Sequence, residues 1–148
     1  MKNNISVLKP ALKPALFLCA LTLAGAAQAQ VAVVVGAKSP TAAMTADQVA
    51  SIFLGKTSTL PSGATAAAAD QSESAAVRDQ FYTKVTGKQA AQVKAAWSRL
   101  VFSGKGTPPK EMASSADVKK FVAGNPDAIG YIEKSAVDGS VKVVFSVD

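Results

Sequence analysis

The chain has 148 residues, which is enough for one domain but hardly for two. It carries 16 lysine and arginine residues against 10 aspartate and glutamate residues, a net charge of +6, with a single cysteine and no histidine. The absence of histidine excludes a Ser-His-Asp triad, a Cys-His pair and any histidine-ligated metal site.

The first 29 residues have the pattern of a secretory signal peptide. Three lysines form a basic start, an apolar run follows over 15–27, and Ala27-Gln28-Ala29 fits the small-x-small rule for cleavage. A membrane anchor is the alternative, but the run is shorter than the ~20 residues that a spanning helix needs. We therefore expect cleavage after Ala29 and an exported domain over 30–148.

Removal of this segment changes the charge and the redox chemistry of the protein. It leaves 148 − 29 = 119 residues, and the loss of three lysines lowers the net charge from +6 to +3. It also removes the only cysteine, Cys19, so the mature chain cannot form a disulfide. A mild positive excess suits an anionic ligand and does not indicate nucleic-acid binding.

The first half of the mature chain predicts a strand, a helix and a second strand. Residues 31–36 are a β-branched run that ends in glycine, which is typical of a buried strand. Thr45 and Gln48 fit a capping box at the start of a helix that stops at Gly55. The alanines of 64–69 favour helix by propensity, but the run is short and lies between turns, so we expect a strand.

The loop after the first strand, 37–41, contains two hydroxyl side chains, Ser39 and Thr41. If a ligand sits at the strand ends, both are placed to donate to it. Local turn hydrogen bonds are the alternative role for these residues.

The stretch 70–104 organises the rest of the chain. Helical spacing of apolar residues predicts one helix from about Glu73 to Gly87 and another from about Gln89 to Gly104. The second carries the only tryptophan, Trp97. Since Trp97 shares the apolar face, we expect it to pack in the core rather than to stack on a ligand.

The last part of the chain predicts a helix followed by two strands. Ser114 or Ser115 caps a helix that stops at Gly124, and the strands cover 128–132 and 141–147. Strands that alternate with helices predict an α/β sheet covered by helices.

In such sheets ligands bind beyond the carboxyl ends of strands, where loops enter helices, and 70–78 is the best candidate for that position. A helix start presents free N–H groups and the positive end of the helix dipole, which favour an anion. Arg78 could add a fork of donors from the first turns of the helix. A surface salt bridge of Arg78, with Ser74 acting only as a helix cap, is the alternative.

Four stretches of the sequence, taken in order, carry a family resemblance. They are Thr45…Gln48-Val49…Ile52-Phe53-Leu54-Gly55-Lys56, Arg78-Asp79-Gln80-Phe81-Tyr82, Trp97-Ser98-Arg99-Leu100-Val101-Phe102-Ser103-Gly104-Lys105-Gly106 with Pro108-Pro109, and Ala128-Ile129-Gly130-Tyr131-Ile132. Together they resemble small exported proteins related to the phosphate-binding components of ABC transporters, which have a periplasmic-binding-protein-like domain.

The resemblance implies a single compact α/β domain of the type II periplasmic-binding-protein kind, with a mixed sheet flanked by helices. It also implies a periplasmic location and a tetrahedral oxyanion, foremost phosphate, as ligand. In the larger relatives the ligand turn reads Ser-Gly-Thr, and Ser74-Ala75-Ala76 is the nearest match here. The residues that we expect to contact the ligand are Ser39, Ser72, Ser74, Ala75, Ala76 and Arg78.

Two classes of function fit these features. The first is a non-catalytic periplasmic solute-binding protein for phosphate or a related oxyanion, associated with the membrane components of an ABC transporter. The second is an interaction or sensor-partner protein that keeps the fold but binds ligand poorly. An enzyme that uses Asp70, Glu73 and Asp79 is disfavoured, because acidic residues at a helix start have an ordinary structural explanation. We expect no cofactor, no metal and no nucleic acid, and the sequence does not determine an oligomeric state.

Overall fold

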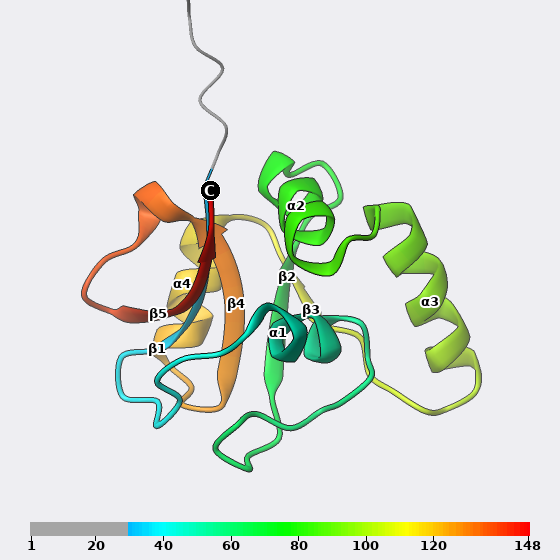
Figure 1. Ribbon diagram of the computed structural model, residues 1–148, viewed down its shortest axis with the longest axis horizontal. Coiled ribbons are helices and arrows are strands. Elements are labelled where there is room, and N and C mark those ends of the chain that lie inside the picture. Colours follow the sequence, from blue (N-terminus) through cyan, green and yellow to red (C-terminus); the bar gives the residue numbers. More distant parts are fainter. Residues whose placement is uncertain (1–29) are drawn as a thin grey trace, which may run out of the picture.

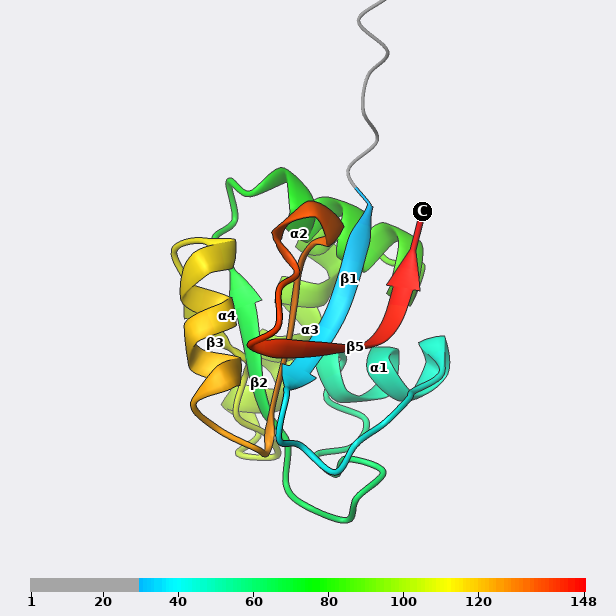
Figure 2. The ribbon, with the colours of Figure 1, turned by 90° about the vertical axis from the view of Figure 1, so that its left-hand side faces the viewer.

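The computed structural model describes residues 30–148, and the predicted signal peptide with its cleavage site lies outside the described residues. Residues 30–148 form a five-stranded sheet in the order β3-β2-β4-β1-β5, with helices on both faces (Figures 1 and 2). The predicted α/β class, with a mixed sheet flanked by helices in one domain, is confirmed.

The strands are β1 (Val31–Gly36), β2 (Ala67–Gln71), β3 (Lys110–Met112), β4 (Ala128–Glu133) and β5 (Val141–Val147). The α-helices are α1 (Ala46–Phe53), α2 (Ala76–Phe81), α3 (Ala90–Phe102) and α4 (Ser115–Ala123). A π-helical turn over Tyr82–Thr86 continues α2, and a 3-10 turn over Lys134–Ala136 follows β4.

The pairing of the strands decides which loops meet at each edge of the sheet. Strand β2 runs parallel to β3 and β4, whereas β1 runs antiparallel to β4 and β5. Ile129 in β4 pairs with Ala68 on one side and with Val35 on the other. The carboxyl end of β1 therefore lies at the end of the sheet where β2 begins. The loops that follow β1 and β2 leave from opposite ends of the sheet.

Strand β1 is buried along its whole length, as its β-branched run predicts, because both faces of the sheet are covered. Val33 and Val35 belong to the core shared with α1 and α2, and Val34 belongs to the core shared with α4. Alternate side chains of one strand thus link two apolar layers.

The start of α1 confirms the predicted capping box. Thr45 Oγ1 accepts from the N–H of Gln48 at 3.2 Å, and Gln48 Oε1 accepts from the N–H of Thr45 at 2.9 Å. The helix ends at Phe53, two residues before Gly55, which adopts a positive φ of 75°. These signals are local, which is why the sequence alone reveals them.

Two predicted boundaries need correction, and one strand was not predicted. The strand expected over 64–69 is β2 and lies two to three residues later. The helix expected from Glu73 begins at Ala76, because a turn over 72–75 comes first, in which the N–H of Ala75 donates to the Ser72 carbonyl at 3.0 Å. Strand β3 was not expected, since three largely exposed residues carry no periodic signal.

Among residues 30–148, no helix combines the length and the apolar character that crossing a membrane would require.

Gly130 in β4 offers a test of how closely α4 packs on the sheet. A Cβ at this position would lie 2.6 Å from Val118 Cγ1 and 3.3 Å from Val122 Cγ2. We expect Gly130→Ala to lower the free energy of unfolding by about 1–3 kcal/mol, measured by urea denaturation, because the buried valines must shift. Gly139→Ala is the control, since a Cβ there meets nothing within 4 Å. Equal stability of the two variants would contradict this packing.

Candidate anion-binding site

The starts of α2 and α4 lie at the same end of the sheet. Parallel strands β2 and β3 are each followed by a helix, so both helices begin near the carboxyl ends of these strands (Figure 2). The side chain of Gln71 joins the two junctions, because its Nε2 donates to Ser115 Oγ at 2.9 Å. This is the edge at which the sequence predicts a ligand site.

A buried carboxylate, Asp70, lies at the end of β2 and is 8% exposed. It accepts hydrogen bonds from the hydroxyl of Tyr82 at 2.7 Å and from the hydroxyl of Tyr131. The backbone N–H of Gln71 donates to it at 2.8 Å, and Arg78 Nε lies 3.4 Å from both of its oxygens. These donors offset the free-energy cost of burying the Asp70 charge.

Aromatic rings hold the donors of Asp70 in place. The ring of Phe81 stacks on that of Tyr131 with centroids 4.0 Å apart and planes 6° from parallel. The guanidinium carbon of Arg78 lies 5.1 Å from the centroid of the Tyr82 ring, which is a cation–π contact. Strand β4, helix α2 and the π-helical turn therefore converge on one carboxylate.

The electrostatics of this cluster follow from burial and from the Asp70 charge. Burial opposes the charge on Arg78, but Asp70, Tyr82 and Tyr131 together outweigh burial, so the pKa of Arg78 is raised. The pKa values of the Tyr82 and Tyr131 hydroxyls are also raised, first by burial and then by the negative charge of Asp70. Both tyrosines stay neutral donors well above neutral pH.

Within residues 30–148, only the Nε–H group of the Arg78 side chain donates a hydrogen bond. Its side chain is 10% exposed and its Nε faces Asp70, whereas Nη1 and Nη2 have no hydrogen-bond acceptor among residues 30–148. The alternative interpretation, a surface salt bridge, does not describe this geometry, because the pair with Asp70 is buried. An anchored guanidinium with free terminal amino groups is a donor fork for an oxyanion.

The turn before α2 adds further donors. Ala75 is the N-cap residue of α2, and no side chain caps the helix by a hydrogen bond. Ser74 therefore does not act as the cap. Within the described part of the chain, the N–H groups of Ala76 and Val77 have no acceptor. Ser72 Oγ and Ser74 Oγ lie 3.3 Å apart at the same turn. Two amides and two hydroxyls are thus available within a few residues of Arg78.

Ser39 is not brought to this turn. It follows β1 and therefore lies at the opposite edge of the sheet, because β1 is antiparallel to β4. Its Oγ accepts from the N–H of Thr41 at 3.3 Å, and its carbonyl accepts from Lys142 Nζ at 2.7 Å. The local turn bonds that were the alternative for Ser39 are what the structure contains.

The carboxylates suggested for an enzyme do not converge on one point. Asp70 is bound within the buried cluster, and Glu73 forms an exposed ion pair with Lys94 at 2.5 Å. Hydrogen bonding and attraction from Lys94 lower the pKa of Glu73. Residues 30–148 also contain no group of three or more His, Cys, Asp or Glu side chains placed to hold a metal ion.

Sequence reasoning missed the two tyrosines of the cluster. Tyr82 follows Arg78 by four residues, so helical spacing could have indicated that its ring lies beside the guanidinium. Tyr131 is 61 residues from Asp70, and only the parallel pairing of β2 with β4 brings the two together. No local pattern could have found that contact.

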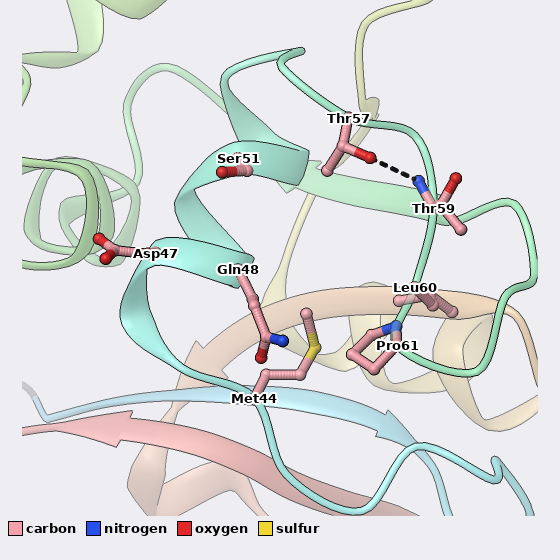
Figure 3. A pocket seen from close by; sticks show the side chains of 8 residues that line it. All are labelled: Met44, Asp47, Gln48, Ser51, Thr57, Thr59, Leu60 and Pro61. Carbon is pink, nitrogen blue, oxygen red and sulfur yellow. Dashed lines mark hydrogen bonds between the residues drawn. The ribbon is translucent and has the colours of Figure 1, made fainter.

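A hollow of about 290 Å³ lies away from this site, beside α1 and the loop that contains Thr57 and Pro61 (Figure 3). Its lining residues are Met44, Asp47, Gln48, Ser51, Thr57, Thr59, Leu60 and Pro61. No lysine or arginine lines it, and its one charged residue is the acidic Asp47. It therefore offers an anion nothing comparable to Arg78.

Comparison with protein-family models and with curated proteins finds no match to this chain. Solved structures do match. A candidate phosphate ABC transporter substrate-binding protein with bound phosphate, from Clostridium perfringens, is 24% identical with a TM-score of 0.63 over 78% of this chain and 45% of that chain. An ABC-type phosphate transport receptor from Vibrio cholerae is 20% identical, with a TM-score of 0.61 over 78% and 46%.

This chain has a periplasmic-binding-protein-like fold. PstS from Borrelia burgdorferi matches in the same way, at 13% identity and a TM-score of 0.57, over 78% of this chain and 47% of that chain. The chain spans slightly less than half the length of these structures. At such low identity the likeness shows the fold, and the fold expected from the sequence resemblance is confirmed.

The raised pKa values of the two tyrosines give a test of the Asp70 cluster. A folded pKa above the unfolded value of about 10 means that the hydroxyls stabilise the fold below pH ~10 and that this stability is lost at higher pH. We expect almost no tyrosinate absorbance from the folded protein at about pH 10.5, whereas the urea-unfolded chain ionises there. Tyr82 and Tyr131 are the only tyrosines, so the signal is unambiguous. Identical titrations of folded and unfolded protein would contradict the cluster.

Proposed function

We propose that this protein is an exported, non-catalytic solute-binding protein that holds phosphate or a related tetrahedral oxyanion at the start of α2. The observation that carries the proposal is Arg78, whose Nε is anchored on Asp70 while Nη1 and Nη2 have no acceptor among residues 30–148. The cation is thus aligned before any ligand arrives. Charge-assisted hydrogen bonds to an oxyanion are the strongest that such a fork can make.

The remaining contacts come from the turn before α2. Residues 72–77 carry two N–H groups without an acceptor in the described part of the chain, those of Ala76 and Val77, and the hydroxyls of Ser72 and Ser74. Ala75 was expected to take part, but its N–H already donates to the Ser72 carbonyl. The structure thus favours the amides one and two residues later as ligand donors.

The comparisons support the ligand class and the physiological role. Two of the matched structures are described as phosphate transport proteins, and one holds phosphate. By that likeness, together with the predicted signal peptide over 1–29, this protein acts in the periplasm and delivers its ligand to the membrane components of an ABC transporter. The carboxylates at the site support a binding role over catalysis, because each has a structural partner or faces solvent.

A ligand-poor interaction or sensor-partner protein on the same fold is the second candidate. The observation that favours it is the exposure of Ser74 and Ala76. An anion at this turn would keep part of its hydration, and hydrogen bonds to a hydrated anion contribute less than those in a dry cleft.

Phosphate titration by calorimetry tests the proposal on the chain from Gln30 onward, after unfolding and refolding to remove any bound ion. We expect saturable phosphate binding, and we expect Arg78→Lys to weaken it by about tenfold, because a lysine cannot keep the Asp70 contact and the fork at once. Arg99→Lys, on α3, changes the only other arginine and serves as the control.

Stability of each variant is measured alongside, because Arg78 also pairs with buried Asp70. Unchanged phosphate affinity in a folded Arg78→Lys variant would remove the proposed site. A folded protein that binds no phosphate would instead favour the ligand-poor candidate.

A further inference from the structure

Helix α3 lies at the edge of the molecule, to one side of β2 and β3 (Figure 1). A groove of about 620 Å³ runs along it. The apolar lining of the groove consists of Trp97, Val101 and Phe102 on α3 and of Pro108 and Pro109 before β3. The polar lining consists of Asp70, Glu73, Lys94, Ser98 and Glu111. None of the groups proposed to contact the anion lines the groove, so it is a separate feature of the surface.

Helix α3 leaves much of its own surface in water. Val93 is its one buried residue. Phe102, at its last position, is 96% exposed, and Val101 is 49% exposed. Because these large apolar side chains lie together beside a groove, covering them would be favourable, and such a face is typical of an interaction surface.

Trp97 gives the groove a fixed wall. It packs against the core cluster that contains Phe53, and its Nε1 donates to the Phe53 carbonyl at 2.8 Å. This confirms the expected core contact of Trp97, but the residue is only half buried and also lines the groove. A wall that is held in advance lowers the cost of ordering a partner against it.

Cations flank the exposed ring of Phe102. Arg99 precedes it by three residues, which makes the two side chains neighbours on the surface of α3, and Lys105 follows it by three residues. Neither cation forms an ion pair within residues 30–148. The end of α3 thus presents an aromatic ring between two uncompensated positive charges.

The groove itself is acidic. Asp70, Glu73 and Glu111 line it against Lys94 alone. Asp70 is paired with Arg78 and Glu73 with Lys94, but Glu111, on β3, forms no ion pair in the described part of the chain. A ring that arrives with positive charges beside it would therefore be attracted to the groove.

We propose that this face is the interface of a symmetric homodimer, in which Phe102 of each copy enters the groove of the other. The face carries both complementary parts, an exposed ring beside cations and a groove with an unpaired carboxylate. This combination fits a two-fold interface, in which each contact occurs twice. Arg99 of one copy then meets Glu111 of the second copy, and the reverse, because a guanidinium fork matches a carboxylate better than an ammonium does. Dimerisation at this face is independent of the proposed function.

The size of the face sets the expected strength of the dimer. At a rise of 1.5 Å per residue α3 is about 20 Å long, and a helix is about 10 Å wide. Such a face is smaller than the roughly 800 Å² per partner of a standard stable interface. We therefore expect a reversible dimer with a dissociation constant of about 10–100 µM.

Sedimentation equilibrium of the chain from Gln30 onward, over a series of protein concentrations, tests the interface. We expect a monomer–dimer equilibrium that Phe102→Ser weakens by about tenfold, because a buried aromatic anchor is removed. The emission of Trp97, the only tryptophan, should change with the same concentration dependence. Val143→Ser is the control and should leave association unchanged, since Val143 is also an exposed apolar residue but lies on β5, away from the groove.

Two charge reversals identify the face. In Arg99→Glu and in Glu111→Lys, each two-fold contact brings like charges together, so each variant alone should dimerise at least about tenfold more weakly than the unchanged protein. In an equal mixture of the two variants, both contacts between unlike copies again join opposite charges. We expect the mixture to recover the dimer at the same total concentration, which a folding defect in either variant would prevent.

Three results would overturn the proposal. A folded protein that stays monomeric up to about 1 mM, a concentration at least tenfold above the expected dissociation constant, has no such interface. A dimer that Phe102→Ser does not weaken uses another face. Charge reversals that leave association unchanged, or an equal mixture that recovers no dimer, exclude the contact between Arg99 and Glu111. None of these results bears on phosphate binding, which the calorimetric titration measures separately.

Discussion

The buried carboxylate of Asp70 joins the end of β2 to three other elements of the fold. Its donors come from β4, from α2 and from the π-helical turn that follows α2, so a single charge ties the sheet to the helix beside the proposed site. Removing one partner of a buried ion pair typically costs about 3–5 kcal/mol, because the other charge is left uncompensated. The two tyrosines and Arg78 therefore act together, and their effects on stability are not expected to be additive.

The same pairing is what makes Arg78 the candidate anion contact. Asp70 accepts from Nε of Arg78, and among residues 30–148 no acceptor is bonded to Nη1 or Nη2. The turn before α2 leaves the amides of Ala76 and Val77 unbonded at the same edge. Under the proposed function, the cost of aligning these donors is met during folding rather than during binding, which favours affinity at a partly hydrated site.

Local signals in the sequence predict much of this architecture, and non-local contacts account for what they miss. The capping box of Thr45 and the apolar run of β1 involve neighbouring residues, and the structure confirms both. The misplacement of Ser39 arose because strand direction is decided by pairing between distant segments, and β1 turns out to be antiparallel to β4. Tyr131 was missed for the same reason. Arg78 was singled out because the segment 70–78 has the local pattern of a strand end followed by a helix start, and its contact with a ligand stays a prediction.

A phosphate titration followed by two-dimensional NMR would report which N–H groups contact the anion. We expect the largest shifts on the N–H groups of Ala76 and Val77 and on the Nε–H of Arg78. Residues around the hollow beside α1, such as Thr57 and Leu60, should not move. Shifts concentrated at that hollow, or no shifts at all in a folded protein, would contradict the claim that the Asp70–Arg78 pair prepares an oxyanion site.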